Sequence, residues 1–558
     1  MYIIINIILV ISILALILLG LKFNKKSNEK LEKIGQWLEE FIKKYYKILV
    51  MLLLFLTFFT SIFKITTLPY GLHVDEAGLS YDAISIAKYG VDRYLRSYPV
   101  WLNNYYGSQS SMYAYILVIL IKIFGYSKLL LRLPAVIFRL LIFISMLWVL
   151  KDEKNQLKSV LFLFIFAICP YFIMNSRWAL DCNLLVGFIT ISECILIKSI
   201  LKSSNKLLFI SGIFFGLSLY TYALSFIIIP LILLLDCIYL LHIKEFNFKK
   251  LVIFGIPIFL FSIPLMLMLL INNGYVEEIS GFITIPKLVG YRGSDIMFPN
   301  FIENFYIIGT IFSFDNTRIF GSVYWYNALE EFGTIYYANI PFFLLGFAWA
   351  FTKMVKSIKE KKFDINSIFI FWFLAVLFCM FMVKTPTIHR ANAIFTPIVY
   401  FVAIGIYVAF KKSKAFIIPV TLILTINFGM FLNYYFREYN KNSEGKFLFA
   451  TTYLDVLDYA KSLKREDIYF DQLLTSEQYI YTLLDHEVSP YSYNTELIVG
   501  EYEGTEITYH FEDNSKWEEL NSNAVYVTGP SEDLLARFTD SGFSHKQFGI
   551  YRVFYCEE

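Results

Sequence analysis

The sequence has little charge. Only 17% of its 558 residues are charged, whereas 57% are hydrophobic and the mean hydropathy is +0.57. Soluble globular domains contain about 25% charged residues. The composition therefore excludes an ordinary soluble protein and predicts a polytopic membrane protein. Aromatic residues make up 19% of the chain, and tyrosine and tryptophan concentrate where a membrane meets water.

Cysteine and histidine are scarce, with six of each. Most of the cysteines lie inside apolar runs. No group of cysteines and histidines has the spacing of a zinc site or of a disulfide framework. The apolar N-terminus also lacks a basic start and a small-residue cleavage site. We therefore expect it to be a retained helix rather than a cleaved signal peptide.

The formal net charge of +3 is distributed unevenly. From Arg437 to the end the chain has 10 Lys and Arg against 23 Asp and Glu, whereas the preceding residues have 39 against 23. The chain thus combines a basic membrane body with an acidic tail. An acidic tail of this kind is not typical of a nucleic-acid-binding protein.

Twelve apolar runs are long enough to span a bilayer, which takes roughly 17–25 residues. They are 2–22, 48–66, 128–150, 159–175, 183–200, 207–222, 223–241, 251–271, 336–353, 366–384, 393–410 and 415–434. With twelve spans, all the lysine-rich loops fall on one side, which the positive-inside rule predicts to be cytoplasmic. These loops are 22–47, 151–158, 202–206, 244–250, 353–362 and 411–414. Both termini are then expected outside.

Two segments are expected to lie at the membrane surface instead of crossing it. Residues 112–124 are apolar but short, and counting them as a span would place the later lysine clusters outside. We therefore interpret them as an interfacial or re-entrant helix. Residues 29–46 alternate charged and apolar groups at helical spacing, which is typical of a cytoplasmic surface helix.

The predicted fold class is mostly α, a polytopic membrane helical bundle with a C-terminal extracytoplasmic α/β domain. Residues 1–47 form an extra transmembrane helix and a basic amphipathic segment, 48–435 the transmembrane domain, and 436–558 an acidic soluble domain. The large outside loops are 67–127 and 272–335. In the tail, helices are expected at 455–464, 477–484 and 532–540, and strands at 467–470 and 524–528.

Asp75 and Glu76 lie just after the apolar run 48–66, where a hydrophobic helix is expected to leave the membrane. A charge at that depth is costly and is usually paired or functional. One reading is a general base that takes a proton from an acceptor hydroxyl. The other is a helix N-cap, in which Asp75 and Glu76 cap a helix that starts near Ala77. The pattern alone leaves both open.

Cationic groups reach the same outside face in two places. Arg177 and Asp181 would face the same way on a helix, either as an ion pair or as an arginine fork on a phosphate oriented by the acid. Lys384, His389 and Arg390 form the second group, although an arginine there can also simply reach lipid headgroups. Together with the carboxylate pair, these clusters favour a lipid-phosphate substrate over an ion path.

Four short motifs carry a resemblance to a known family. They are His73-Val-Asp-Glu-Ala-Gly, Phe124-Gly125 followed by Arg132-Leu-Pro-Ala, Ser176-Arg-Trp-Ala-Leu-Asp-Cys-Asn, and Gly216-Leu-Ser-Leu-Tyr-Thr-Tyr. In this order, over about residues 48–434, the sequence resembles the GT-C superfamily of membrane glycosyltransferases. It looks most similar to the bacterial family 39 type, which includes protein O-mannosyltransferase-like and aminoarabinose transferase-like enzymes.

The resemblance implies a polyprenyl-phosphate sugar donor and an inverting transfer on the outer face of the cytoplasmic membrane. The acceptor would be an envelope glycopolymer, lipid or protein. By this analogy Asp75 deprotonates the acceptor and Glu76 assists or positions it. No cofactor is required, and a divalent cation near the two acids is compatible with their chemistry but not favoured. The partners are the lipid-linked sugar, the acceptor and the bilayer, with no nucleic acid.

Further site residues extend this analogy by charge and topology. Arg177 and Arg390 are predicted to bind the donor phosphate. Tyr220 and Tyr222 either line the donor groove or belong to an ordinary aromatic belt. Two other functions stay open: a flippase or transporter of lipid-linked saccharide, which predicts inverted repeats, and a non-enzymatic envelope assembly protein, in which the two carboxylates are dispensable.

Overall fold

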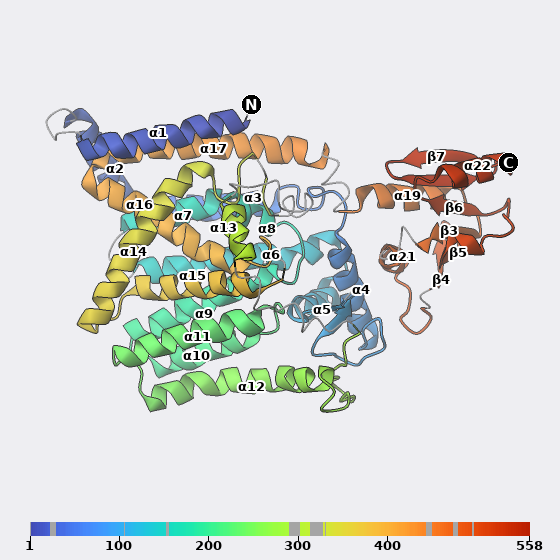
Figure 1. Cartoon of the computed structure of the whole chain (residues 1–558), viewed down its shortest axis with the longest axis horizontal. Helices are drawn as coiled ribbons and strands as arrows, with labels where there is room; N and C mark the ends of the chain where they lie inside the picture. Colours follow the sequence, from blue (N-terminus) through green and yellow to red (C-terminus); the bar gives the residue numbers. More distant parts are fainter. Residues whose placement is uncertain are drawn as a thin grey trace.

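The computed structural model describes residues 2–22, 29–104, 107–151, 156–289, 302–312, 327–329, 331–384, 386–441, 449–472, 478–493 and 496–557. Part of the predicted loop 272–335 lies outside these ranges. Figure 1 shows long helices packed side by side, with a sheet domain beyond one end of the bundle.

Each of the twelve predicted runs contains a helix of the bundle. These are α1 (Tyr2–Lys22), α3 (Tyr46–Ile62), α6 (Lys128–Leu150), α7 (Gln156–Ile168), α9 (Asn183–Leu201), α10 (Asn205–Ser218), α11 (Ser225–His242), α12 (Phe248–Asn272), α14 (Ile340–Glu360), α15 (Ile365–Met382), α16 (Phe395–Lys412) and α17 (Ile417–Glu438). Within the described part of the chain, eight helices are long and apolar enough to span a membrane, or nine if α3 and the helix before it count as one span. The predicted polytopic helical bundle is confirmed.

Two of the predicted spans contain shorter apolar helices than expected. Helix α7 has 13 residues and α10 has 14, which corresponds to roughly 20 Å of helix. After α7 the chain continues into the short helix α8 (Pro170–Asn175), which begins at a proline. The proline lacks a backbone N–H and ends the preceding hydrogen-bond ladder. The run at 159–175 is therefore two helices and not one.

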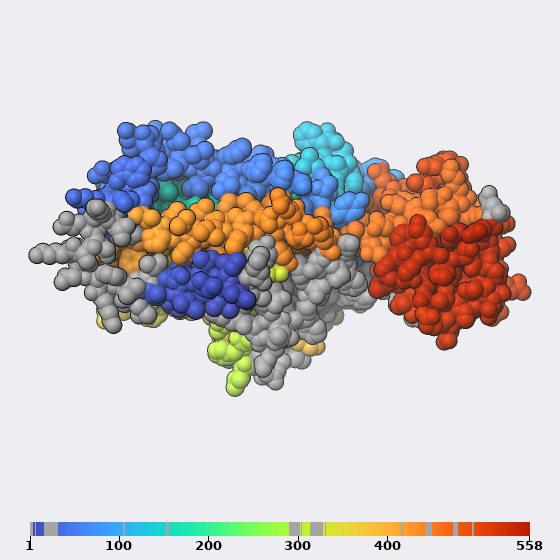
Figure 2. Space-filling view, turned by 90° about the horizontal axis from the view of Figure 1, so that it is seen from above, coloured from blue at the N-terminus to red at the C-terminus, as the bar shows by residue number. Residues whose placement is uncertain are grey.

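Helix α2 (Glu29–Lys44) confirms the predicted amphipathic helix. It turns by 82° from α3, so it runs across the end of the bundle. Glu39 lies 3.8 Å from Lys411, in the last turn of α16, and 3.0 Å from Lys414, in the short helix before α17. Helix α1 lies alongside α17 and also contacts α14 (Figure 1; Figure 2). The N-terminal segment is thus packed onto the last helices of the bundle.

Helices α4 (Val74–Tyr89) and α5 (Met112–Phe124) pack against each other at the end of the bundle that faces the sheet domain (Figure 1). A hairpin of β1 (Leu102–Asn104) and β2 (Gly107–Gln109) precedes α5. At 13 residues, α5 is too short to cross a bilayer core of about 30 Å. The remaining short elements of this part are η5 (Glu303–Phe305), α13 (Tyr306–Ile311), η6 (Tyr337–Asn339), η7 (Asn392–Ile394), η8 (Lys414–Phe416) and η9 (Tyr439–Lys441).

In its described residues, the C-terminal part is a six-stranded mixed sheet with three α-helices. Its elements are α19 (Thr451–Ser462), β3 (Asp467–Asp471), α21 (Tyr479–Asp485), β4 (Leu497–Tyr502), β5 (Thr505–Glu512), η10 (Asn514–Lys516), β6 (Val525–Thr528), α22 (Glu532–Asp540), β7 (Ser544–Phe548) and β8 (Tyr551–Tyr555). The strand order is β4-β5-β3-β6-β8-β7, with β3 parallel to both neighbours and the other pairs antiparallel. The predicted α/β tail is confirmed, although β4, β5, β7 and β8 were not predicted.

The sheet domain packs directly on α4. The Tyr81 hydroxyl of α4 donates to the Val488 carbonyl over 2.7 Å, and the Tyr481 hydroxyl of α21 donates to the Leu72 carbonyl over 3.1 Å. Apolar side chains of α4, α5 and the sheet domain form one buried cluster. Gly71 permits this approach, because a Cβ at that position would lie 1.7 Å from the Phe449 carbonyl oxygen. The start of α4 is therefore held from both the membrane bundle and the sheet domain.

Candidate active site

Helix α4 begins with a capping box. The His73 Nδ1 atom accepts a hydrogen bond from the Asp75 backbone N–H over 3.1 Å, and a Glu76 carboxylate oxygen accepts from the His73 backbone N–H over 3.0 Å. The helix-cap reading of this stretch is therefore confirmed, but with a correction. His73 is the N-cap and α4 starts at Val74, because the imidazole nitrogen takes the accepting role that we had predicted for Asp75.

Asp75 is the accessible carboxylate of the pair. Its side chain is 28% exposed, and one oxygen lies 3.5 Å from His73 Nδ1. Since Nδ1 accepts the backbone hydrogen bond, it carries no proton there, and this approach is not an ion pair. The imidazole ring packs edge-on against Trp178, at 5.3 Å between ring centroids, and against Phe449 at 6.2 Å. Asp75 thus stands at the rim of an aromatic wall.

Glu76 lies in a different environment, with no exposed surface. Arg132 of α6 donates from Nε and Nη2 to its two oxygens, each over 2.9 Å. The Ala179 backbone N–H donates over 2.7 Å in addition to the bond from His73. Burial alone would raise the pKa of Glu76, but Arg132 and the two backbone donors hold it below its ordinary value. The carboxylate is ionised and fully bonded, which suits a positioning role.

Arg132 also ties down the chain that leads into α4. Its Nη1 donates to the carbonyls of Ile65 and Pro69, both over 2.8 Å, and its Nη2 donates to the Gly71 carbonyl over 3.0 Å. One buried guanidinium therefore fixes the segment from the end of α3 to the cap of α4. This arrangement determines where the neighbouring Asp75 side chain stands.

A second carboxylate, Asp181, lies near Asp75. One of its oxygens accepts from the backbone N–H and the hydroxyl of Ser110, over 3.0 and 2.9 Å. The other accepts from the Cys182 N–H over 2.7 Å. The pKa of Asp181 is raised to about 6. Burial is the largest cause and the Asp75 charge acts in the same direction, whereas the hydrogen bonds from Ser110 act in the opposite direction. Two carboxylates from distant segments therefore share one electrostatic environment.

The predicted pairing of Arg177 with Asp181 is wrong. Residues 176–182 form a turn between α8 and α9 instead of a helix, so the spacing of four does not align the two side chains. The Arg177 guanidinium is fully buried and donates to the carbonyls of four residues at the end of α3 and in the following loop: Thr60, Ser61, Phe63 and Leu68. Its contacts are those of a structural clamp.

The second predicted cationic group lies in the loop after α15. Lys384 is exposed, whereas His389 and Arg390 are partly buried. Burial lowers the pKa of His389 to about 3, with further contributions from Arg390 and His73. This imidazole is therefore neutral at physiological pH. The role predicted for Lys384, His389 and Arg390 stays a prediction.

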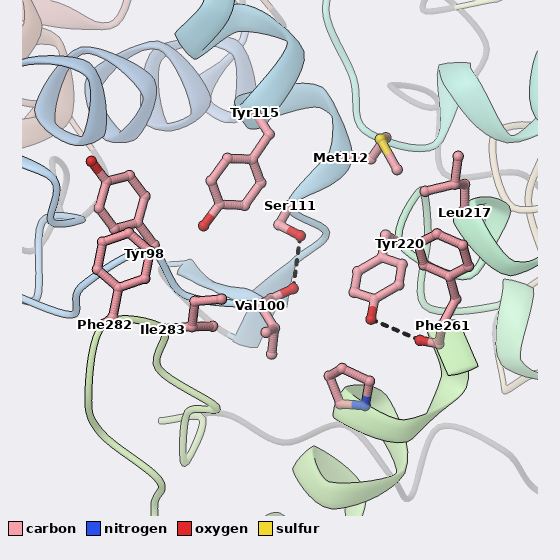
Figure 3. Close-up of a pocket in the computed structure, with 11 residues that line it drawn as sticks. Tyr98, Val100, Ser111, Met112, Tyr115, Leu217, Tyr220, Phe261, Phe282 and Ile283 are labelled. Atoms are coloured by element: carbon pink, nitrogen blue, oxygen red, sulfur yellow. Dashed lines mark hydrogen bonds between the residues drawn. The ribbon is translucent and has the colours of Figure 1, made fainter. Parts of the chain in front are cut away.

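The two tyrosines at the end of α10 differ in their surroundings. Tyr220 lines a pocket of about 510 Å³ between the α5 end of the molecule and helix α12 (Figure 3), and its hydroxyl donates to the Phe261 carbonyl over 2.8 Å. Tyr222 packs on the apolar core of the bundle. Tyr220 therefore borders this pocket, and Tyr222 is not among the residues that line it.

In the described residues, no group of three or more His, Cys, Asp and Glu side chains is arranged to hold a metal ion. Asp82, six residues after Glu76 on α4, is bound by Arg93 at 2.9 Å to one oxygen and 2.8 Å to the other. The Glu76 and Asp82 carboxylates are thus each paired with an arginine.

Sequence reasoning missed the roles of His73, Ser110 and Arg132. For Arg132 a signal existed, because an arginine near the start of an apolar run is usually paired with an acid. For Ser110 the sequence gives no such signal, because its hydrogen bond to Asp181 joins residues that are 71 positions apart.

No protein-family model matches the chain, and no curated protein matches its sequence. Solved structures do match. ArnT from Cupriavidus metallidurans, bound to undecaprenyl phosphate, superposes with a TM-score of 0.54 at 11% identity, over 91% of this chain and 97% of its own. The chain has the fold of ArnT. The apo form of the same protein matches equally well, with a TM-score of 0.54 over 92% of this chain.

ArnT is a GT-C aminoarabinose transferase, and the chain shares the fold of this GT-C enzyme. The archaeal oligosaccharyltransferase AglB from Archaeoglobus fulgidus, in complex with an inhibitory peptide and a dolichol-phosphate, matches with a TM-score of 0.42 and 12% identity over 74% of this chain and 56% of its own. With its apolar helices and its ArnT-like fold, the chain is a multi-pass membrane protein.

Proposed function

We propose that this chain is an integral membrane glycosyltransferase that moves a sugar from a polyprenyl-phosphate donor to an envelope glycopolymer, lipid or protein. The observation that carries the proposal is the pairing of an accessible Asp75 with a buried, arginine-bound Glu76 at the start of α4. Support for the donor class comes from the shared fold, since the ArnT structure holds undecaprenyl phosphate.

In the proposed reaction Asp75 is the general base. An acceptor hydroxyl passes its proton to the Asp75 carboxylate while its oxygen attacks the anomeric carbon of the sugar. The bond from that carbon to the lipid phosphate breaks, and the phosphate leaves with the electron pair. Attack from the face opposite the leaving group inverts the anomeric configuration. The nearby Asp181 charge stabilises positive charge that develops on the sugar.

The departing phosphate needs cationic and hydrogen-bonding partners, which we assign to the loop after α15. Lys384 and Arg390 supply positive charge there. His389, neutral because its pKa is about 3, supplies a ring N–H and not a charge. We assign Arg177 a positioning role, because its guanidinium already binds backbone carbonyls.

We further propose that the site and both termini face the extracytoplasmic side of the cytoplasmic membrane. Helices α4 and α5 and the sheet domain lie at the same end of the molecule (Figure 1). The lysine-rich segments 202–206, 244–250 and 353–362 connect helices at the other end, and positively charged short loops stay in the cytoplasm.

The test is a transfer assay in nanodiscs with a panel of polyprenyl-phosphate sugars and envelope extract as acceptor. We expect wild type to release lipid phosphate and to form a product of inverted anomeric configuration. Asp75→Asn is expected to lose activity, whereas the control Asp458→Asn, whose side chain is 73% exposed on the sheet domain, keeps it. Labelled lipid that crosses the bilayer without phosphate release would instead indicate a flippase, and envelope assembly that survives Asp75→Asn would indicate a scaffold.

A further inference from the structure

Two acids lie deep inside the helical bundle and have no part in the proposed transfer. Glu193 is the eleventh residue of α9, which has 19 residues, and Asp236 is the twelfth residue of α11, which has 18. At 1.5 Å per residue, each lies roughly 15–17 Å along its helix, near the middle of a bilayer core of about 30 Å. Neither residue has any exposed surface.

The two carboxyl groups face each other between the neighbouring helices α9 and α11 (Figure 1). They lie within hydrogen-bonding reach of each other, and none of their four oxygens accepts a hydrogen bond from another described group. Ionised carboxylates are acceptors only, so two of them cannot bond to each other directly. A proton or a metal cation is therefore needed between Glu193 and Asp236.

The surroundings of the pair supply no positive charge. Among the residues that the structure describes, each acid has the other as its only charged neighbour, so the packed helices α6, α10, α15, α16 and η7 bring no charge to it. Lys198 of α9 comes five residues after Glu193, which is about 140° around the helix, and its ammonium lies over the Trp148 ring at 5.2 Å. The other titratable groups that the pair influences are the thiols of Cys194 and Cys237.

We infer that Glu193 and Asp236 form a proton-binding site, in which two carboxyl groups are joined by the protons that they hold. Protonation removes a charge whose burial at this depth would be costly, and it turns each acid into a hydrogen-bond donor. A metal ion fits less well. The pair offers at most four oxygens, whereas Ca²⁺ takes about six to eight and Mg²⁺ requires an octahedron.

The bound protons hold α11 to α9. In the protonated pair the helices are joined by a hydrogen bond, whereas two carboxylates in the same place would repel each other in a medium of low dielectric constant. Helix α9 begins at Asn183, two residues after Asp181 of the candidate site, so the protons stabilise the helix on which that acid stands. Because the folded protein holds protons that the unfolded chain releases, the contribution of the pair to stability falls as the pH rises.

Infrared spectroscopy of the full-length protein tests the inference directly. A protonated carboxyl group has a C=O stretching band that a carboxylate lacks and that shifts in D₂O. Spectra are recorded in a detergent without ester groups at about pH 8, where Asp92 and Asp181, each with a pKa of about 6, are ionised. The band is expected to lose at least half of its area in Glu193→Gln and in Asp236→Asn, and most of it in the double variant.

Two control variants accompany these spectra. Asp458→Asn, which replaces an acid that is 73% exposed on the sheet domain, should leave the band unchanged. Asp236→Glu keeps a carboxyl group on α11 and should keep the band, which separates loss of the proton from loss of the fold. A wild-type protein without the band, or a band of equal area in the double variant, would overturn the inference.

Thermal unfolding in the same detergent measures the consequence for stability. From about pH 7 to 10, the melting temperature of wild type is expected to fall more steeply than that of Glu193→Gln/Asp236→Asn, which has no proton to lose at this place. Equal slopes would contradict the inference. A melting temperature that rises with Na⁺ or Ca²⁺ in wild type but not in the double variant would assign the pair to a metal cation instead. Neither measurement needs sugar transfer, so both outcomes are independent of the proposed function.

Discussion

Arg132 and Glu76 lie 56 residues apart in the chain and form a two-pronged ion pair, with both N–O distances at 2.9 Å and neither side chain exposed. The pair explains how two adjacent acids can have different roles. The Glu76 carboxylate is bound to Arg132 and stabilises the fold. The side chain of Asp75, one residue earlier, is 28% exposed. The first two predictions follow from this division.

Asp75→Asn is expected to reduce sugar transfer by about a hundredfold or more, the usual effect of losing a general base. Its melting temperature should change little, because the capping box uses the Asp75 backbone N–H and not its carboxylate. Phosphate release and thermal unfolding in the same detergent measure both effects. Full activity in the variant would move the base to another residue.

Glu76→Gln is expected to destabilise the fold by about 3–5 kcal/mol, the cost of leaving a buried arginine without its acid. Thermal unfolding monitored by size-exclusion chromatography measures the loss. The double variant Glu76→Gln with Arg132→Met is expected to be more stable than Glu76→Gln alone, since it removes the unpaired charge. An unchanged melting temperature with abolished transfer would show that Glu76 acts in the chemistry.

The pH profile of transfer is expected to fall as the pH decreases through about 6, where Asp181 takes up a proton and its charge is lost beside Asp75. His389 cannot cause this limb, because its pKa lies near 3. Stability has the opposite sign. The folded state holds the Asp181 proton more tightly than the unfolded chain does, with its ordinary value of 3.8, so this group's contribution to stability falls as pH rises from about 4 to 6. In Asp181→Asn the decrease in transfer rate below about pH 6 should disappear. A decrease that persists in this variant would show that another group causes it.

Arg390→Gln and Arg177→Gln are expected to separate donor binding from folding. Loss of a charge-assisted hydrogen bond to phosphate is worth roughly 1.5–3 kcal/mol, so Arg390→Gln should raise the KM for the donor at least tenfold at an unchanged melting temperature. Arg177→Gln should lower the melting temperature, because it frees the carbonyls of Thr60 and Phe63. A higher KM in Arg177→Gln together with a lower melting temperature in Arg390→Gln would instead indicate that Arg177 binds the phosphate.

Gly71→Ala is expected to detach the sheet domain from α4, because the added Cβ would lie 1.7 Å from the Phe449 carbonyl oxygen. Limited proteolysis between the bundle and the sheet domain should become faster, and transfer should decrease. Gly429→Ala on α17 is the matched control, since a Cβ there meets no atom within 4 Å. Equal protease resistance of the two variants would show that the close approach of Gly71 and Phe449 does not hold the sheet domain on α4.

The bundle was predictable because each apolar run is long and the positions of the lysine loops agree with one another. Local pattern also predicted the helices near 455–464 and 532–540, which the structure has at Thr451–Ser462 and Glu532–Asp540. The hairpin of β4 and β5 was not predicted from the sequence. Its turn places Glu503 and Gly504 at positive φ, but Glu-Gly is not among the pairs that typically mark such turns.

The site was only partly predictable, because its contacts join distant segments. The position of Asp75 followed from its place after an apolar run. The different environments of Asp75 and Glu76 could not be predicted, because they depend on Arg132, which lies on another helix. Arg177 was misplaced for a local reason: the spacing of four assumes a helix, and residues 176–182 form a turn. The periodicity of a sequence predicts which residues share one face of a helix or strand. It does not predict which distant residue pairs with a buried charge.

The contact between the sheet domain and α4 has a consequence for biosynthesis. A ribosome makes Asp75 early, but Phe449, Tyr481 and Val488, which pack around the beginning of its helix or bond to it, emerge near the end of translation. The nascent chain can insert its helices without completing the aromatic wall beside Asp75. We therefore expect a protein truncated before residue 449 to insert its helices but to lack Phe449 beside His73, and the proposed transfer to require the longer chain.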